Sequence, residues 1–431
     1  MSVDLATARL PRLELDERLP ADHESIIRAT LPLVGKHITE IAPVFYRRMF
    51  AAHPNLLANT FNRGNQAQGA QQKALAASVA TYATLLVTPE APSPKEMLGR
   101  IGHKHASLGI TEDQYAIVHE HLMDAIVEVL GADLITDEAA DAWSAVYWHM
   151  ARTLIAFEHE LYADAGVEPG DVFREAVVVS RTEESSRVAS FELVAPSSAD
   201  PLPDFVPGQY TSVGVRLADG ARQLRQYSLS DAPGEGRWRI TVRREDSVES
   251  APEGEVSTWL HEHLRQGDRL QVTLPYGDLA LDTSADSPVV LVSAGIGATP
   301  MVGMLRHIAA NQPHRQVVVL HADGDAADAA LVREMVATVS ELPTSAGSRL
   351  SLWFSRSRAA DPLDGRVDER MVACEGRMQI AAEQLPHGAE VYLCGSNAFL
   401  QGARAQLQEA GVDADRIHFE LFSPNDWLLP A

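Results

Sequence analysis

The chain has 431 residues, a length that suggests two or three domains. Hydrophobic residues make up 45% and charged residues 22%, as in an ordinary water-soluble globular protein. The 36 basic and 59 acidic residues give a net charge of −23, which argues against nucleic acid or an anionic membrane as the main partner, because both repel an acidic surface. The two cysteines, Cys374 and Cys394, are too few for a disulfide scaffold and suit the reducing cytoplasm, where we expect the protein. No apolar run reaches about 18 residues, so we expect no membrane span.

Residues 1–20 form an N-terminal extension that lacks the order of a secretory signal, and we assign it no role. Residues 21–165 then carry apolar positions spaced by three and four, which is the period of a helix. The glycines and the proline of residues 166–170 end this pattern. We therefore predict an all-α domain with these buried faces: Leu31, Val34, Ile38, Ile41, Phe45 and Met49; Tyr115, Val118, Leu122, Ile126 and Val129; Trp143, Val146, Met150, Leu154, Phe157 and Leu161.

The apolar period changes to two between residues 170 and 283, which is typical of strands with one buried face. Turn residues separate these stretches, so we predict an antiparallel β-barrel domain there. From residue 286 to 431, continuous apolar strands alternate with helical stretches, which indicates an α/β domain whose parallel sheet is buried on both faces. The strands predicted in this last domain are Val289–Val292, Val317–Leu320, Leu350–Phe354 and Val391–Cys394.

Two motifs in these domains carry chemistry. In Arg225-Gln226-Tyr227-Ser228, an Arg, a Tyr and a Ser on adjacent strand residues can serve the pyrophosphate, the ring face and the ring edge of one flavin. Gly295-Ile296-Gly297-Ala298-Thr299-Pro300 follows an apolar strand and precedes a helix, although Pro300 stands where a dinucleotide fingerprint has its third glycine. In this order the two motifs resemble the ferredoxin–NADP reductase superfamily, which implies an electron path from NAD(P)H through FAD.

This resemblance also implies roles for single residues. Arg225 would contact the FAD pyrophosphate, Tyr227 would stack on the isoalloxazine, and Ser228 would reach its reactive edge. Tyr210 matches a residue that packs on the FAD. A helix follows Gly254, and its free N–H groups favour phosphate; we expect Ser257 to cap it, with Thr258 equally plausible.

Several residues of the helical domain could build a haem site. His105 is the candidate iron ligand, although a single histidine among sixteen is weak evidence. Phe61 lies in a short segment between helices, Gln71 opens the next helix, and Leu75 lies one turn later on the same face. His105 follows Gln71 at a distance that lets two helices cross and sandwich a flat cofactor, while Tyr46 lies on an earlier helix.

The segments Val44–Phe50, Phe61-Asn62 and Ile101–His105 resemble the bacterial flavohaemoglobin, or nitric oxide dioxygenase, family, and the resemblance covers about residues 21–424. It implies that His105 is the proximal haem ligand, that Tyr115 and Glu158 are its hydrogen-bonding partners, and that Tyr46 and Gln71 are the distal pair. By the same resemblance Phe61 wedges the haem, whereas Lys104 and Glu420 lie between haem and flavin. A carboxylate such as Glu158 that accepts from the far ring N–H of a haem-bound histidine tunes the iron.

The segment Glu420-Leu421-Phe422-Ser423-Pro424 matches the part of the family that covers the flavin, where Phe422 would stack on the isoalloxazine. The chain departs from the family in its first 20 residues, in extra residues at about 247–253, and in its ending after Pro424. The last of these affects the geometry of the flavin cover and not the identity of the cofactor.

The family resemblance implies a nitric oxide dioxygenase, which converts NO and O₂ to nitrate at the expense of NADH or NADPH and uses FAD and haem b. We expect a monomer. Two alternatives stay open: a flavoreductase whose helical domain holds no haem and which passes electrons to another acceptor, and a haem gas sensor, for which the sequence shows no output domain.

The preference for NADH or NADPH depends on Asp323, at the end of the predicted strand Val317–Leu320. An acidic side chain there would repel a 2′-phosphate and accept from a free 2′-hydroxyl, which favours NADH. The alternative is that Asp323-Gly324 is only a turn.

Overall fold

The computed structural model describes residues 19–67, 70–88, 94–234, 236–247, 252–357, 361–363, 365 and 368–422. Within these ranges it describes all side chains except those of residues 65, 67, 70–77, 96 and 357. Most of the N-terminal extension, the centre of the 247–253 segment and the ending from Ser423 onward therefore lie outside the described residues. Among the described helices, none has the length and the apolar character that crossing a membrane requires.

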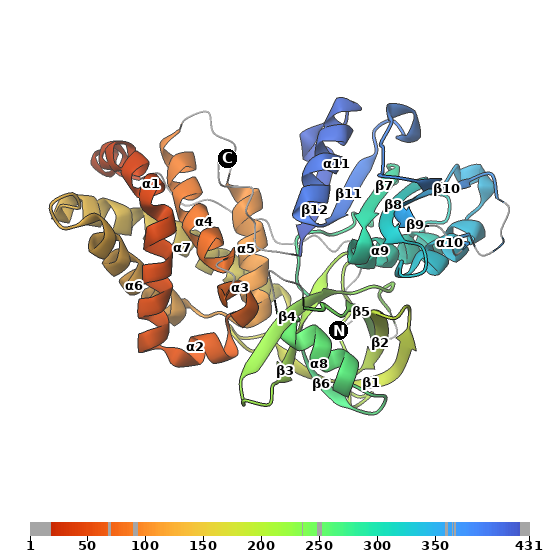
Figure 1. Ribbon diagram of the computed structural model, residues 1–431, viewed down its shortest axis with the longest axis horizontal. Coiled ribbons are helices and arrows are strands. Elements are labelled where there is room, and N and C mark those ends of the chain that lie inside the picture. Colours follow the sequence, from red (N-terminus) through yellow and green to blue (C-terminus); the bar gives the residue numbers. More distant parts are fainter. Residues whose placement is uncertain are drawn as a thin grey trace.

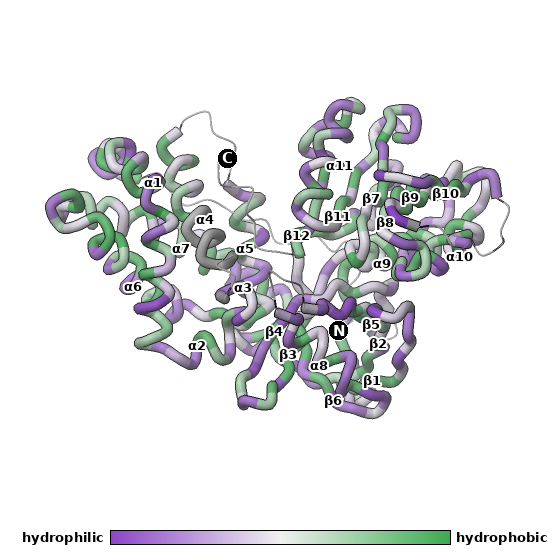
Figure 2. Tube along the Cα trace, viewed as in Figure 1, coloured by the Kyte–Doolittle hydropathy of each residue, from purple (hydrophilic) through white to green (hydrophobic). Residues whose placement is uncertain are grey.

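The first domain is all-α, as predicted (Figure 1). Hydrophobic and hydrophilic residues are interspersed along the coloured parts of the helices (Figure 2), and the apolar residues gather into one core because a helical period of 3.6 puts them on one face. Thr111 and Gln114 form a capping box that fixes the start of the sixth helix. The helices are α1 (Ala21–Ala52), α2 (Pro54–Asn59), α3 (Arg63–Ala67), α4 (Ala70–Val87), α5 (Lys95–Leu108), α6 (Glu112–Leu130) and α7 (Asp137–Asp164).

The second domain is an antiparallel sheet in the strand order β4-β3-β6-β1-β2-β5. The two edge strands of the sheet, β4 and β5, come together: Leu229, just after β4, forms an antiparallel bridge with Ile240 in β5. The sheet is therefore curled into a barrel. Our sequence analysis did not single out β2 as a strand. The elements are β1 (Phe173–Glu183), β2 (Val188–Val194), β3 (Tyr210–Arg216), β4 (Arg222–Ser228), β5 (Arg237–Arg243), α8 (Glu255–His263) and β6 (Arg269–Thr273).

The third domain has a parallel sheet in the order β10-β9-β8-β7-β11-β12. The strands of this sheet are continuously apolar because both of its faces are buried. In β7, Val289 and Leu291 belong to the core under α9 and α10, whereas Val290 and Val292 belong to the core under α11. The elements are β7 (Val289–Ala294), α9 (Ala298–Asn311), β8 (Val317–Asp325), α10 (Val332–Glu341), β9 (Arg349–Ser357), β10 (Met371–Glu375), β11 (Glu390–Gly395), α11 (Asn397–Glu409) and β12 (Ile417–Leu421).

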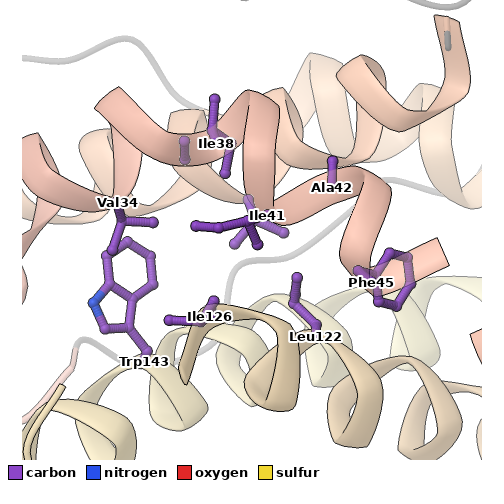
Figure 3. Close-up of a pocket in the computed structure, with 10 residues that line it drawn as sticks. Val34, Ile38, Ile41, Ala42, Phe45, Leu122, Ile126 and Trp143 are labelled. Atoms are coloured by element: carbon purple, nitrogen blue, oxygen red, sulfur yellow. The ribbon is translucent and has the colours of Figure 1, made fainter. Parts of the chain in front are cut away.

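An apolar cavity lies inside the helical domain, between α1, α4, α6 and α7 (Figure 3). Phe45 stands at one end and Trp143 at the other, with Ile41 and Ile126 facing each other between them. The free space is about that of a single water-sized molecule, and no polar atom lines it. Such a space stays dry, so the core beside Tyr46 is closely packed but not completely filled.

Ile126→Ala should enlarge this cavity and lower the free energy of unfolding of the helical domain by about 2–5 kcal/mol, since Ile126 is buried. The urea midpoint of the helical circular-dichroism signal measures the effect. Leu134→Ala is the matched control, because Leu134 is 57% exposed and should change the free energy by no more than about 0.5 kcal/mol. Equal effects of the two variants would mean that Ile126 does not support the core.

Candidate functional site

The side chains of His105, Tyr115 and Glu158 come together from α5, α6 and α7. His105 Nδ1 lies 2.9 Å from Glu158 Oε1 and 2.9 Å from the Tyr115 hydroxyl. Tyr115 in turn donates to the same Glu158 oxygen at 2.5 Å. Burial and the neighbouring Glu158 charge both raise the pKa of Tyr115, so its hydroxyl stays protonated and remains a donor. The Glu158 side chain is only 3% exposed, so it is not a solvated helix carboxylate.

This arrangement fits a haem ligand. Nδ1 of His105 is engaged by Glu158 and Tyr115, which leaves Nε2, at the opposite edge of the ring, as the nitrogen able to bind iron. The His105 side chain is 32% exposed, in contrast to Glu158 behind it. A buried carboxylate behind the ring is the outer partner that orients metal-bound histidines and increases their basicity.

Tyr46 is buried on α1 amid the aromatic rings of Phe45, Phe50 and Phe61, whose centroids lie 4.6, 5.5 and 5.9 Å from its own. Burial raises its pKa, and an interaction with the Gln66 side chain lowers it. The hydroxyl therefore stays protonated, as a hydrogen-bond donor must. Gln71 and Leu75 lie on α4, but their side chains are outside the described residues.

The flavin motif lies on β4, beside β3. The register puts Tyr210 opposite Ser228, so that these two residues share one end of the strand pair. The Tyr210 ring packs over Gly277, whose positive φ of 129° and close contact with that ring exclude a larger residue. Ser228 Oγ is buried without a hydrogen-bond partner among the described residues. A buried hydroxyl without a partner marks a place where a ligand would supply one.

Arg225 lies near the start of α8, with its Nη2 3.7 Å from Glu255. The predicted cap was wrong: the helix begins at Glu255, and Gly254 occupies the N-cap position. Ser257 lies in the first turn, where its hydroxyl accepts from the Glu245 N–H at 3.2 Å and donates to the Gly254 carbonyl at 3.1 Å. Thr258 Oγ1 is buried and has no partner in the described part of the chain. This helix start therefore retains a free hydroxyl and N–H groups for a phosphate.

The glycine-rich turn after β7 forms a short 3₁₀ turn, Gly295–Gly297, that leads into α9 at Ala298. Gly295 has a φ of 53°, and a side chain on Gly297 would collide with the Cys394 carbonyl at 2.4 Å. Both glycines are thus required by the backbone. Thr299 closes the turn by donating to the Ile296 carbonyl at 3.0 Å, and Pro300 is buried in the first helical turn. The turn lies at the carboxyl edge of the sheet, where such sheets bind ligands.

One face of α5 docks on the barrel domain. Its members are Arg100, His103, Lys104 and Ser107, spaced i, i+3, i+4 and i+7. His103 Nδ1 accepts from the Gly277 N–H at 3.1 Å, and the Ser107 and Ser212 hydroxyls are 3.0 Å apart. Lys104 is exposed to solvent, yet the protein atoms around its amine lower its pKa, while the charge of Glu420 raises it. The helix that carries His105 therefore meets the flavin domain directly.

Glu420 is buried at the end of β12. Burial and the nearby Asp278 carboxylate raise its pKa to about 7, and Arg100 and Lys104 lower it. Burial also raises the pKa of Asp278. Leu421 donates its N–H to Glu420 at 2.9 Å, and Phe422, the next residue, is 46% exposed. An exposed aromatic ring at this point is available to cover a flat ligand.

Comparisons with known proteins agree with this architecture. The Globin family profile matches residues 44–154, and that of the oxidoreductase NAD-binding domain matches residues 291–405. The flavohemoprotein of Bordetella parapertussis is 40% identical to the chain and covers 94% of it and 98% of its own length. The chain belongs to the flavohaemoprotein family. A crystal structure of a flavohemoglobin from Malassezia yamatoensis with bound FAD and heme superposes with a TM-score of 0.83 at 32% identity, over 94% of this chain and all of the other.

A second solved structure corresponds to the reductase part of this flavohaemoprotein. It is the flavohem-like FAD/NAD binding domain of a nitric oxide dioxygenase from Vibrio cholerae, with 34% identity and a TM-score of 0.51. It covers 58% of this chain and 99% of its own length.

The structure of the NAD-binding domain rules out the alternative that Asp323-Gly324 is only a turn. Asp323 is not in a turn, because β8 continues to Asp325 with an irregularity between the two residues. The Asp323 carboxylate accepts from the Gly324 N–H at 2.6 Å and lies 3.9 Å from Nε2 of the buried His321. The guanidinium of Arg356 lies against Gly324, where an added side-chain carbon would meet it at 2.3 Å. An acidic side chain, Asp323, and a basic one, Arg356, thus lie at the same edge of the sheet.

Sequence reasoning missed four residues of this site. Gln66 lies close enough to Tyr46 to lower its pKa, and Arg63 reaches from α3 to Asp219 and Glu255 in the barrel domain, at 2.6 Å each. Arg100 and Asp278 meet between α5 and the segment after β6. Only the spacing of Arg100 before Lys104, one helical turn, signalled that it faces the barrel.

Glu420→Gln should stabilise the flavohaemoprotein relative to the wild type at about pH 8 but not at about pH 5. The folded-state pKa of about 7 lies above the ordinary 4.5, so folding takes up a proton between these values. The wild type therefore loses stability as pH rises through about 7, whereas the variant has no proton to lose. The temperature at which flavin fluorescence appears on heating measures this. Glu409→Gln, on the exposed side of α11, is the control; a stability difference independent of pH would contradict the assignment.

Proposed function

We propose that the chain is a nitric oxide dioxygenase that uses FAD and haem b and oxidises NADH or NADPH. The observation that carries the proposal is the position of α5, which presents His105 to a buried carboxylate on one side and docks on the flavin-binding domain with another face. The likeness to a flavohemoglobin with bound FAD and heme supports the two cofactors. The likeness to the reductase part of a nitric oxide dioxygenase supports the reaction.

The two ends of the path would be held by the residues described above. His105 would hold the haem iron through Nε2, and Arg225, Tyr227 and Ser228 on β4 would hold the FAD, with Tyr210 packed behind. When bound, the flavin supplies the change from two-electron to one-electron transfer, and the haem iron supplies O₂ binding and reaction with NO. The reaction balances, since NO, O₂ and one electron give nitrate.

The residues around the iron site have separate tasks. The protonated Tyr46 hydroxyl would donate to an anionic oxygen species, and the aromatic rings around it exclude water from that side. Glu158 would accept a hydrogen bond from Nδ1–H of His105 and so increase the basicity of Nε2, the nitrogen that would bind iron. With haem bound, this combination would hold O₂ tightly, which would suit chemistry on O₂ better than its release.

His105→Ala should abolish haem binding while FAD remains bound, because the iron loses its proximal protein ligand. NO consumption with NADH in air should fall by more than about 100-fold, since even outer partners of metal ligands are worth 10–100-fold. Visible spectra and an NO electrode measure the two effects.

His37→Ala is the matched control, because His37 lies on α1, more than two turns before Tyr46, and its Nδ1 lies 3.1 Å from Glu40. A wild type that reduces its flavin but contains no haem would favour the flavoreductase alternative. A wild type that binds haem and O₂ but consumes no NO would favour the gas sensor.

NADH should give the higher kcat/KM of the two nucleotides, because the Asp323 carboxylate can accept from a ribose 2′-hydroxyl and repels a 2′-phosphate. Asp323→Ser should narrow the difference by about tenfold or more, the value of one charge-assisted hydrogen bond. Asp325→Ser, two residues later on β8, is the control. If NADPH proves the better substrate, the ribose contact belongs to the Arg356 guanidinium and not to Asp323.

A further inference from the structure

Arg100 is a residue of the helical domain that touches both other domains. It lies on α5, one helical turn before Lys104 and on the face that docks on the barrel. Its Nε is 3.7 Å from Asp278, in the segment that follows β6. Its Nη2 donates to the Phe419 carbonyl at 3.4 Å, and its guanidinium lies 4.3 Å from the centroid of the Phe419 ring. The Arg100 side chain is 16% exposed, so these contacts are largely shielded from solvent.

We propose that Arg100 is a positioning residue for electron transfer, which holds the end of β12, and with it Glu420, against the helix that carries the haem ligand. The inference rests on the proposed function, because it assumes that electrons pass from the flavin to the haem. Arg100 acts through its contacts with Phe419 and Asp278.

Phe419 immediately precedes the residues that are expected to lie between the haem and the flavin, so its position affects theirs. The next residue is Glu420, whose carboxylate faces Asp278, Arg100 and Lys104, and Leu421 and Phe422 follow as the segment expected to cover the flavin. β12 is the last strand at the edge of its sheet and pairs only with β11 among the described strands. Its outer side therefore depends on contacts from other elements, and Arg100 supplies one to its backbone and one to its ring.

The chemistry of the guanidinium suits this task. A flat cation can stack on a ring, donate to a carbonyl and face a carboxylate at the same time, whereas an ammonium group cannot. Arg100 also offsets the negative charges of the half-buried Asp278 and the buried Glu420, where the Asp278 carboxylate opposes the ionisation of Glu420. One side chain of the helical domain thus both holds Phe419 in place and balances the carboxylates beside it.

The chain offers a matched control in Arg404. Its guanidinium also lies over the Phe419 ring, at 5.6 Å from the centroid, but it comes from α11 within the nucleotide domain itself. Loss of Arg404 removes a cation from the same ring but leaves the contacts between α5 and Phe419 in place. A comparison of the two variants therefore separates the link between domains from the packing of Phe419.

The experiment is anaerobic reduction of the holoenzyme by NADH, followed by stopped-flow absorbance of the flavin and of the haem. In Arg100→Ala, haem reduction should slow by about 10- to 100-fold, because small displacements of reacting partners cost this much, while flavin reduction stays within about twofold of the wild type. Arg100→Lys should recover part of the loss, since it restores charge but not stacking. Arg404→Ala should behave as the wild type.

Undiminished haem reduction in Arg100→Ala would overturn the proposal, and so would equal losses in flavin and haem reduction or an equal effect of Arg404→Ala. Hydrogen–deuterium exchange of the 417–422 segment gives a readout that needs no electron transfer. It should rise in Arg100→Ala and not in Arg404→Ala. If the wild type reduces its flavin but not its haem, the proposed function fails, and exchange alone decides whether Arg100 holds β12; unchanged exchange refutes that role.

Discussion

The contact between α5 and the barrel domain is the constraint on which the rest of the structure depends. A single helix of 14 residues must direct His105 toward Tyr115 and Glu158 and, with a second face, meet the domain that carries the flavin motif. The period of 3.6 residues per turn makes this possible, because residues at i, i+3, i+4 and i+7 share a face that His105 does not. If this contact were mobile, the two redox centres would have no fixed separation.

The hydrogen bonds across this contact connect elements that are far apart in the sequence. Ser107 meets Ser212, which in turn accepts from the Gln226 amide at 3.0 Å, and Gln226 belongs to the flavin motif. A second junction runs from Arg63 to Glu255 at the start of α8. Each junction pairs a residue next to a haem-domain motif with a residue next to a flavin motif. The helical and barrel domains are therefore joined by polar contacts that are specific in direction, in addition to their apolar cores.

Much of this architecture could be predicted from the sequence, and the physical reasons are clear. Long periodic helices such as α7 and continuous buried strands such as β7 leave strong patterns, and the three fold classes were confirmed. The edge strands β10 and β12 were missed because each has only one neighbouring strand and is only five residues long, and because His418 and Glu420 interrupt the apolar residues of β12. The cap of α8 was wrong because both Ser257 and Thr258 are good capping residues, and only the backbone decides which residue precedes the helix.

The site divides in the same way. His105, Tyr115 and Glu158 could be named together because a family motif connects them, and the structure brings them within hydrogen-bonding distance. Arg100, Arg63 and Asp278 could not be named, since a charged residue on a helix or in a loop is most often solvated, and only the meeting of two domains makes it otherwise. The effect of Gln66 on the pKa of Tyr46 likewise depends on where the fold places α3 and α1, which no local sequence pattern signals.

The burial of Cys394 has a consequence for durability. Its thiol is fully enclosed at the carboxyl end of β11, beside the glycine-rich turn, and burial raises its pKa well above the ordinary value. Oxidants and nitrosating agents attack the thiolate, and this sulfur forms almost none. Cys374, on the edge strand β10, is the more accessible of the two. In a protein proposed to work with NO and O₂, the thiol beside the glycine-rich turn, Cys394, is therefore protected from oxidation. The more accessible thiol, Cys374, lies at the far edge of the sheet, where its oxidation would leave the turn unchanged.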